Sequence, residues 1–167
     1  MADPEILYFA DDGATPNNPR LPALVWRGAL PPGGGAEGAE ALFARNGWPP
    51  AWRDGIHPWH HFHPNAHEAL AIVRGTVRVQ LGGEGGAALD LAEGDVVALP
   101  AGVGHRNLGA SGDLLVVGAY PPGAAPETLR AEGLGREGHD RAVHAVTETP
   151  DPPGEPVRGR PWPDMPG

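Results

Sequence analysis

Short apolar runs separated by glycine fill the middle of the chain, between residues 52 and 120. The runs cover residues 70–73, 77–81, 87–91, 94–99 and 113–120. Apolar side chains occupy even positions before Gly75 and odd positions after it, and this change of parity indicates a turn or bulge between two strands. Strands at this spacing, joined by glycine turns, predict an all-β sandwich or barrel.

The flanking segments carry weaker patterns. Residues 36–45 predict a helix because Ala39, Leu42 and Phe43 share one face, and residues 21–26 predict an edge strand. Residues 126–132 predict a short helix, and residues 147–167, rich in proline and acid, predict an extended tail over the surface or a disordered end. We therefore divide the chain into an N-terminal arm whose short helix packs on the barrel (1–50), a barrel core (51–122), and a C-terminal helix and extended tail (123–167).

Composition narrows the chemistry. Glycine (26) and proline (21) argue against a mostly helical fold of 167 residues. The net charge of −9 disfavours nucleic-acid and anionic-membrane partners. The chain has no lysine, no cysteine and a single serine, Ser111, which removes Schiff-base, thiolate and serine-elbow chemistry. Histidine, carboxylate and metal chemistry remain.

The expected location is the cytoplasm. The N-terminal residues lack the basic and apolar regions of a secretory signal. Apolar runs also stay well short of the roughly 20 residues that a membrane span needs.

Histidines cluster at the start of the predicted barrel. Five of the eight histidines lie between positions 57 and 67, and His61 and His63, two residues apart, project from the same face of a strand. Glu68 opens the next apolar run, and His105 follows a later one. Three imidazoles and a carboxylate from adjacent strands can converge on one ion, and this ligand set suits a transition metal rather than calcium or magnesium.

The same region resembles the cupin superfamily. The fixed positions of the first cupin motif are matched by Gly55, His61, His63, Glu68 and Gly75, and those of the second by Gly94, Pro100, Gly102 and His105. The second motif normally ends in asparagine where this chain has Gly109, although Asn107 lies close by. Residues 15–19, 46–48, 60–63 and 118–123 look similar to small single-domain bacterial cupins called YjlB-like.

The resemblance implies a fold, a metal site and an assembly. The fold is a double-stranded β-helix, or jelly-roll barrel, of about six to eight strands. In the family, the residues that match His61, His63, Glu68 and His105 bind one divalent transition metal per chain, here Fe, Mn, Ni, Zn or Cu. Cupins also commonly pair, so a homodimer is expected.

A small-molecule substrate or ligand would bind beside this metal. The candidate substrate-binding residues are Asn107, Trp59, Arg53 and His57. Arg53, like Arg74, Arg78 and Arg106, can hold a substrate carboxylate, although a solvated surface position is the commoner role of an arginine.

Three functions stay open from the sequence. The leading hypothesis is a metal-dependent enzyme, a dioxygenase-like oxidoreductase acting on a small polar organic molecule. One alternative is a metal-dependent isomerase or lyase. The other is a cupin without catalysis, either a binding or sensing module or a barrel that its metal only stabilises.

Overall fold

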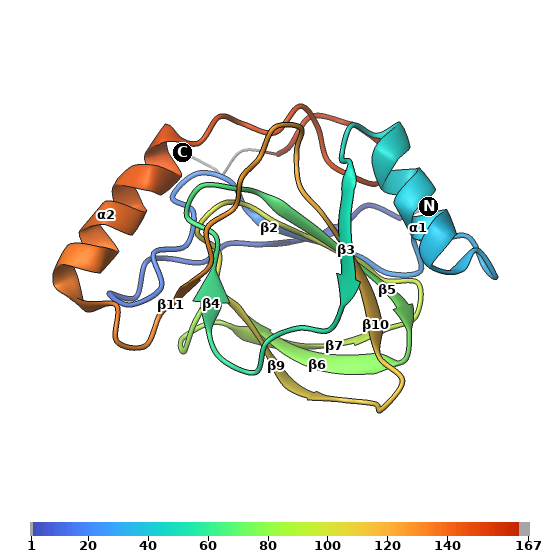
Figure 1. The fold of residues 1–167 in the computed structure, drawn as a ribbon, viewed down its shortest axis with the longest axis horizontal. Helices are drawn as coiled ribbons and strands as arrows, with labels where there is room; N and C mark the ends of the chain where they lie inside the picture. Colours follow the sequence, from blue (N-terminus) through green and yellow to red (C-terminus); the bar gives the residue numbers. More distant parts are fainter. Residues whose placement is uncertain (1, 164–167) are drawn as a thin grey trace.

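The computed structural model describes residues 2–163, which form two antiparallel sheets facing each other (Figure 1). The six-stranded sheet runs in the order β1 (Glu5–Leu7), β2 (Ala23–Trp26), β8 (Val96–Leu99), β5 (Glu68–Arg74), β10 (Leu115–Ala119) and β3 (Pro50–Asp54). The five-stranded sheet runs in the order β11 (Leu129–Arg130), β4 (His61–Phe62), β9 (His105–Ala110), β6 (Thr76–Leu81) and β7 (Ala87–Ala92). The two sheets confirm the all-β barrel that the strand spacing predicted, and their arrangement is the jelly roll that the resemblance implied.

The interior of the barrel is filled from both sheets. Leu70 and Ile72 of β5 contribute from the six-stranded sheet, and Val77 and Val79 of β6 contribute from the other. The parity change between β5 and β6 is therefore a crossover between sheets. Gly75 makes it with φ +83, and a Cβ there would lie 2.4 Å from the Ser111 hydroxyl oxygen, so the crossover requires glycine.

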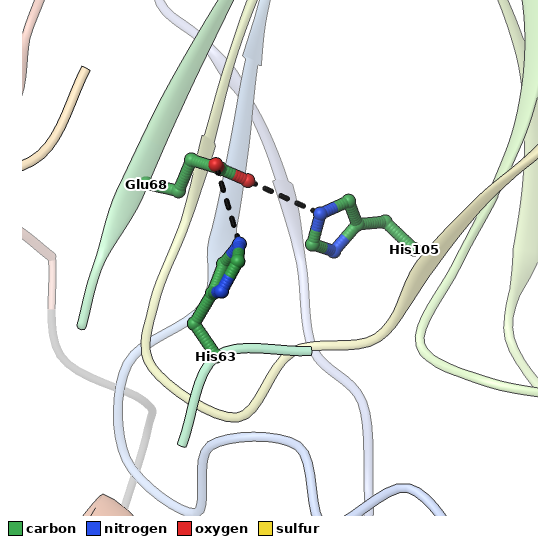
Figure 2. Close-up of side chains that lie close together, drawn as sticks. All are labelled: His63, Glu68 and His105. Carbon is green, nitrogen blue, oxygen red and sulfur yellow. Dashed lines mark ion pairs between the residues drawn. The ribbon is translucent and has the colours of Figure 1, made fainter. Parts of the chain in front are cut away.

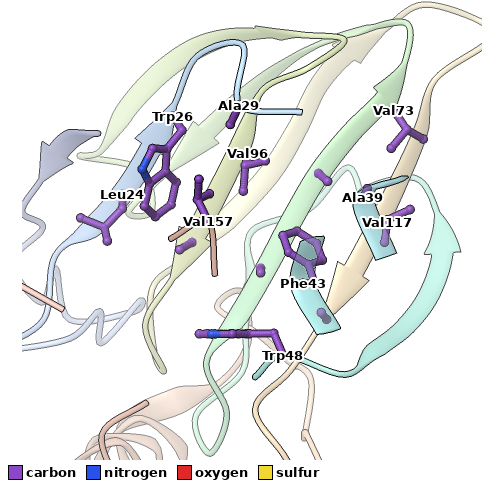
Figure 3. Close-up of a cluster of buried hydrophobic side chains, with 14 residues drawn as sticks. Leu24, Trp26, Ala29, Ala39, Phe43, Trp48, Val73, Val96, Val117 and Val157 are labelled. Carbon is purple, nitrogen blue, oxygen red and sulfur yellow. The ribbon is translucent and has the colours of Figure 1, made fainter. Parts of the chain in front are cut away.

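A second core covers the outer face of the six-stranded sheet (Figure 3). Small side chains such as Ala69 and Ala71 of β5 allow α1 (Gly35–Arg45) to approach closely, and its Phe43 is fully buried there. Trp48 lies in the same cluster and donates a hydrogen bond from Nε1 to the Gly154 carbonyl oxygen at 3.0 Å. Both faces of the four central strands of this sheet are therefore buried, whereas its outer strands β1 and β3 are largely exposed.

The N-terminal region differs in part from the prediction. The helix at residues 36–45 is confirmed as α1. The edge-strand prediction for residues 21–26 is wrong, because β2 lies between β1 and β8. The edge on this side of the sheet is β1. This strand has only three residues and is mostly exposed, so it has no run of alternating apolar residues that would predict a strand.

The C-terminal third also differs from the prediction. Residues 126–132 form no helix but contain β11, which pairs with β4. The second helix is α2 (Gly135–Glu148), at the opposite end of the molecule from α1 (Figure 1). Its buried stripe is only Gly138, Ala142 and Val146, too sparse to predict a helix. Beyond it, residues 149–163 are extended or in turns, and the rest of the predicted tail lies outside the described residues. Within residues 2–163, no helix is long and apolar enough to cross a bilayer.

Candidate metal centre

Three strand ends bring His63, Glu68 and His105 together at one end of the barrel (Figure 2). His63 directly follows β4, Glu68 is the first residue of β5, and His105 is the first residue of β9. The backbone supports this arrangement, since the Gly102 N–H donates to the His63 carbonyl oxygen at 2.8 Å.

The three side chains form a tight, buried cluster. Their ligand atoms lie within 4.8 Å of one another. Glu68 Oε2 lies 3.3 Å from His63 Nε2, and Glu68 Oε1 lies 3.1 Å from His105 Nε2. Glu68 is only 2% exposed, and a buried carboxylate requires hydrogen bonds or a cation. Two imidazoles and one carboxylate are the donor set of the facial triad of non-haem iron oxygenases.

Backbone carbonyls fix the orientation of the histidine rings. Nδ1 of His63 lies 2.8 Å from the Glu127 carbonyl oxygen, and Nδ1 of His105 lies 3.2 Å from that of Val103. A carbonyl oxygen only accepts hydrogen bonds, so each Nδ1 carries a proton, and Nε2 of each ring is the atom that faces Glu68. Metal-binding histidines in proteins are oriented in the same way.

This donor set fits a divalent cation. Without a proton or a cation, two Nε2 lone pairs would face the two Glu68 oxygens at 3.1 and 3.3 Å, which is repulsive. Burial favours the protonated acid, but hydrogen bonds from His105 and His63 hold the pKa of Glu68 well below its ordinary value of 4.5. Glu68 is therefore ionised, and a metal ion would satisfy all three groups at once.

His61 lies beside this cluster rather than within it. Its ring centroid is 4.0 Å from that of His105, and its Nδ1 lies 2.9 Å from the Trp59 carbonyl oxygen. Burial and the neighbouring His105 lower the pKa of His61 to about 3, so the ring is neutral and presents an Nε2 lone pair. Among the described residues, the group of ligand atoms within 4.8 Å does not include His61.

A cavity of about 340 Å³ opens onto the cluster. His61, His63, Glu68 and His105 belong to its lining, and the rest of the wall includes Trp52, Asp54, Ile56, His57, Tyr120 and Thr128. Its volume is at the small end of the range of about 300–1,000 Å³ that is typical of ligand pockets. A small organic molecule can therefore reach the metal-binding atoms.

The candidate substrate-binding residues are spread over different places. His57 lines the cavity and stacks on Trp59, with ring centroids 4.8 Å apart. Trp59 is not part of the cavity lining. Asn107 accepts a hydrogen bond on Oδ1 from the Gly109 N–H at 2.7 Å, within its own strand. Arg53 pairs with Glu40 on α1, outside the cavity. The structure thus brings only His57 of these four to the cavity wall.

Tyr120 is a cavity residue that the sequence reasoning missed, and it lies against Trp52, which the sequence offered only as an aromatic residue near the barrel mouth. Trp52 Nε1 donates to the Tyr120 hydroxyl at 3.1 Å, and both side chains line the cavity. A Cβ on Gly118 would lie 2.0 Å from the Trp52 ring, so the indole can occupy this position only because residue 118 has no side chain. Burial and the charge of Glu68 raise the pKa of Tyr120. The phenol therefore stays protonated, with its hydrogen free to point toward Glu68.

Replacing Tyr120 with phenylalanine is expected to weaken metal binding by about 10- to 100-fold, the usual cost of losing a group that supports a ligand. The reason is the loss of the Tyr120 hydroxyl, which accepts a hydrogen bond from Trp52 and lies beside Glu68. Chelator competition measures the affinity. Gly118→Ala, which displaces Trp52, should act in the same direction, whereas Tyr8→Phe on the exposed N-terminal arm should have no effect. Equal affinities in all four proteins would contradict this role.

The metal-free protein is expected to be most stable near pH 6.5. Burial disfavours protonation of His63, but hydrogen bonding and charge from Glu68 outweigh it and raise the pKa above the ordinary 6.5. That contribution is complete below pH 6.5 and is lost as the pH rises through the raised value. His61 changes the free energy of unfolding in the opposite direction. Its pKa is about 3 in the folded protein and 6.5 in the unfolded chain, so protons bind the unfolded chain more readily and stability falls as the pH drops below 6.5.

Urea denaturation of metal-free protein at a series of pH values above and below 6.5 measures both declines in the free energy of unfolding. Bound metal should remove the alkaline decline, because it replaces the proton on His63. A free energy of unfolding that rises steadily from pH 6.5 into the alkaline range without metal would contradict the coupling between His63 and Glu68.

Comparison with known proteins agrees with this geometry. Residues 53–117 match the family model described as Cupin domain. The chain is 39% identical over 153 residues to the "Uncharacterized protein YjlB" of Bacillus subtilis (strain 168), covering 92% of this chain and 89% of that protein.

Similar solved structures include two enzymes. One is the acireductone dioxygenase from Bacillus anthracis with a cadmium ion in its active centre, at 16% identity and a TM-score of 0.41, covering 63% of this chain and 82% of that one. The other is the oxalate decarboxylase of Lactobacillus farciminis in a formate complex, at 19% identity and a TM-score of 0.35, covering 57% of this chain and 32% of that one.

The family follows from the first two comparisons together with the fold. The matched segment begins within β3 and ends within β10, and it contains all four motif residues His61, His63, Glu68 and His105. The relationship to YjlB extends beyond that segment to the arm and to the C-terminal region. The chain therefore belongs to the cupin family and, within it, to the YjlB-like group of small single-domain cupins.

Proposed function

We propose that this cupin is a metal-dependent oxidoreductase of the dioxygenase type that acts on a small polar organic molecule. The observation that carries the proposal is the position of His63, Glu68 and His105 at a cavity of about 340 Å³, with His61 beside them. All four side chains belong to the cavity lining, so a substrate and dioxygen would reach a bound metal through the cavity.

Two polar groups next to the candidate centre, Glu68 and Tyr120, are poorly suited to accept a proton from a substrate. Glu68 is engaged by two histidines, and the raised pKa of Tyr120 keeps its hydroxyl protonated. Neither of these two groups is therefore free to act as a general base, so an isomerase or lyase would have to use His61 or Asp54 of the cavity wall instead. A bound redox-active metal such as iron would supply electron transfer to dioxygen, a step that needs no base from the protein.

The chain itself holds the ligands, orients the substrate and limits water. Carbonyl oxygens of Glu127 and Val103 hold the rings of His63 and His105. Trp52 and Ile56 form an apolar part of the cavity wall. A substrate that enters therefore displaces water from the metal-binding atoms. His57 and Thr128 offer polar contacts at the same wall.

Oxygen uptake tests the proposal. Protein loaded anaerobically with iron(II) is mixed with aerated catechols, thiols and keto acids, and an oxygen electrode records consumption. We expect uptake with at least one class, absent in the His105→Ala variant and retained in His144→Ala, whose side chain is 79% exposed on α2.

Two results would replace the proposal. Turnover of a carbonyl substrate by zinc-loaded protein, with no oxygen uptake by iron-loaded protein, would indicate an isomerase or lyase. Ligand binding without turnover for every metal would indicate a binding module.

A further inference from the structure

Outside the metal-binding residues, the described part of the cavity wall carries a negative charge and no arginine, which does not suit a second anionic group on a substrate. Apart from the metal-binding residues, the one charged side chain among the described residues that line it is Asp54. The rest of the wall is apolar, as at Trp52 and Ile56, or polar and uncharged, as at Thr128 and Tyr120. The chain has no lysine, so arginine is the only permanently charged cation that a substrate carboxylate or phosphate could find.

The arginines nearest to the site in the sequence are engaged elsewhere. Arg53 holds Glu40 of α1 in a two-pronged pair, with Nε–Oε2 at 3.0 Å and Nη2–Oε1 at 2.7 Å. Arg106 donates from Nε to the Gln80 side-chain oxygen at 3.0 Å. Arg130 lies over the Trp59 ring, 3.7 Å from its centroid, and neither of these two residues lines the cavity. No described arginine is therefore placed to hold an anionic group inside the cavity.

Asp54 faces the cavity because of its strand register. On β3, Asp54 lies on the same side as Trp52 and on the opposite side from Arg53. Asp54 pairs in register with Val116, whose side chain belongs to the barrel interior. Its carboxylate accepts a hydrogen bond from the Gly55 N–H at 2.7 Å, and within residues 2–163 no cationic side chain forms an ion pair with it. A negative charge thus stands unpaired at the cavity wall.

The wall and the metal centre together define a polarity along the cavity. A divalent metal and the Glu68 carboxylate sum to one positive charge at the ligand cluster, which attracts an anionic chelating group. Asp54 places one negative charge at the wall. A substrate would therefore be held with its anionic donor atoms on the metal and its other end near a carboxylate.

We infer that this cavity selects a small metal-chelating molecule whose remote end is an ammonium group or is uncharged, and disfavours substrates with a second carboxylate or a phosphate. This inference rests on the proposed function, since it assumes a metal with open positions facing the cavity. Asp54 is the residue that recognises the ammonium group.

Three hydroxamic acids with the same chelating head test the inference on zinc-loaded protein. β-Alanine hydroxamate ends in an ammonium group, propionohydroxamate in a methyl group and succinohydroxamate in a carboxylate. Calorimetric titration should show the ammonium compound binding about 2- to 5-fold more tightly than the neutral one, the usual range for an exposed ion pair, and the carboxylate compound weakest. Zinc is redox-inert, so the measurement does not depend on turnover.

Asp54→Asn is expected to remove the advantage of the ammonium compound while leaving the affinity for propionohydroxamate unchanged. Asp90→Asn removes the same charge on β7, where Asp90 pairs with Arg78 away from this cavity, and should keep the wild-type order. Tightest binding of succinohydroxamate, or an unchanged order in Asp54→Asn, would overturn the inference.

The same titration separates this inference from the proposed function. If no hydroxamate binds to zinc-loaded protein, the open metal centre is absent and both ideas fail. If the predicted order holds but iron-loaded protein consumes no oxygen with any substrate, only the dioxygenase proposal fails.

Discussion

Replacing His105 with alanine is expected to abolish stoichiometric metal binding while the barrel stays folded. His105 is 3% exposed, and its Nε2 lies 3.1 Å from Glu68. The variant keeps only His63 and Glu68 of the compact group. Losing a group that merely supports a ligand costs about 10- to 100-fold in affinity, so losing a ligand should cost at least about 100-fold.

Elemental analysis after dialysis measures the metal content, and circular dichroism verifies the fold. His144→Ala is the matched control, because its side chain is 79% exposed and forms only a 3.9 Å pair with Glu148 on the same helix. Unchanged metal stoichiometry in His105→Ala, with the fold intact, would contradict the assigned centre.

His61→Ala distinguishes a centre of four ligands from one of three. The cupin motif includes His61, whereas the compact group of ligand atoms does not. Because the Trp59 carbonyl orients its ring as Glu127 and Val103 orient those of His63 and His105, we expect His61 to act as a ligand and His61→Ala to lose at least about 100-fold in affinity. An unchanged affinity would leave a facial triad of His63, Glu68 and His105.

The sequence predicted four ligands, His61, His63, Glu68 and His105, and the structure brings the last three together at strand ends. Motif spacing places His63 just past β4, and Glu68 and His105 at the first positions of β5 and β9. The alternation of apolar residues along a strand and the glycines at turns are local features, so they can be recognised in a single sequence. The same reasoning predicted β5 to β8 and α1 at nearly their observed positions.

The rest of the site depends on contacts between distant segments. Trp52 and Tyr120 meet through the pairing of β3 with β10, and Gly118 is small because the Trp52 ring covers it. Glu127, which orients His63, belongs to a segment predicted to be helical but lies in irregular chain just ahead of β11. No periodicity within one strand reports such pairings, so only the register between strands reveals these residues.

Strand register also explains why Arg53, which the sequence offered as a carboxylate-binding residue, does not line the cavity. Arg53 and Asp54 are neighbours in the sequence, yet they point to opposite sides of β3. Arg53 meets Glu40 of α1, and Asp54 meets the cavity. Which of the two faces the interior depends on the pairing with β10, where Val116 opposes Asp54 and Val117 opposes Arg53. A shift of one residue would have placed the opposite charge at the site.

Removing the metal is expected to lower the midpoint of thermal unfolding by about 8–16 °C. A ligand present at about 1,000 times its dissociation constant stabilises the folded state by about 4.1 kcal/mol, and a chain of this size gains about 2–4 °C for each kcal/mol. The physical source is Glu68, which is 2% exposed and faces two Nε2 atoms. Without metal, that carboxylate depends on a proton shared with His63.

Calorimetric scans of metal-loaded and chelator-treated protein measure this shift, and re-addition of metal should restore the higher midpoint. The difference should grow above pH 6.5, where the metal-free protein loses its proton on His63 as the pH passes the raised pKa. His105→Ala should unfold at one temperature whether or not metal is added, because it has lost the site. Equal midpoints for the loaded and stripped wild-type protein would mean that the cluster binds no metal tightly, and the oxidoreductase proposal would lose its basis.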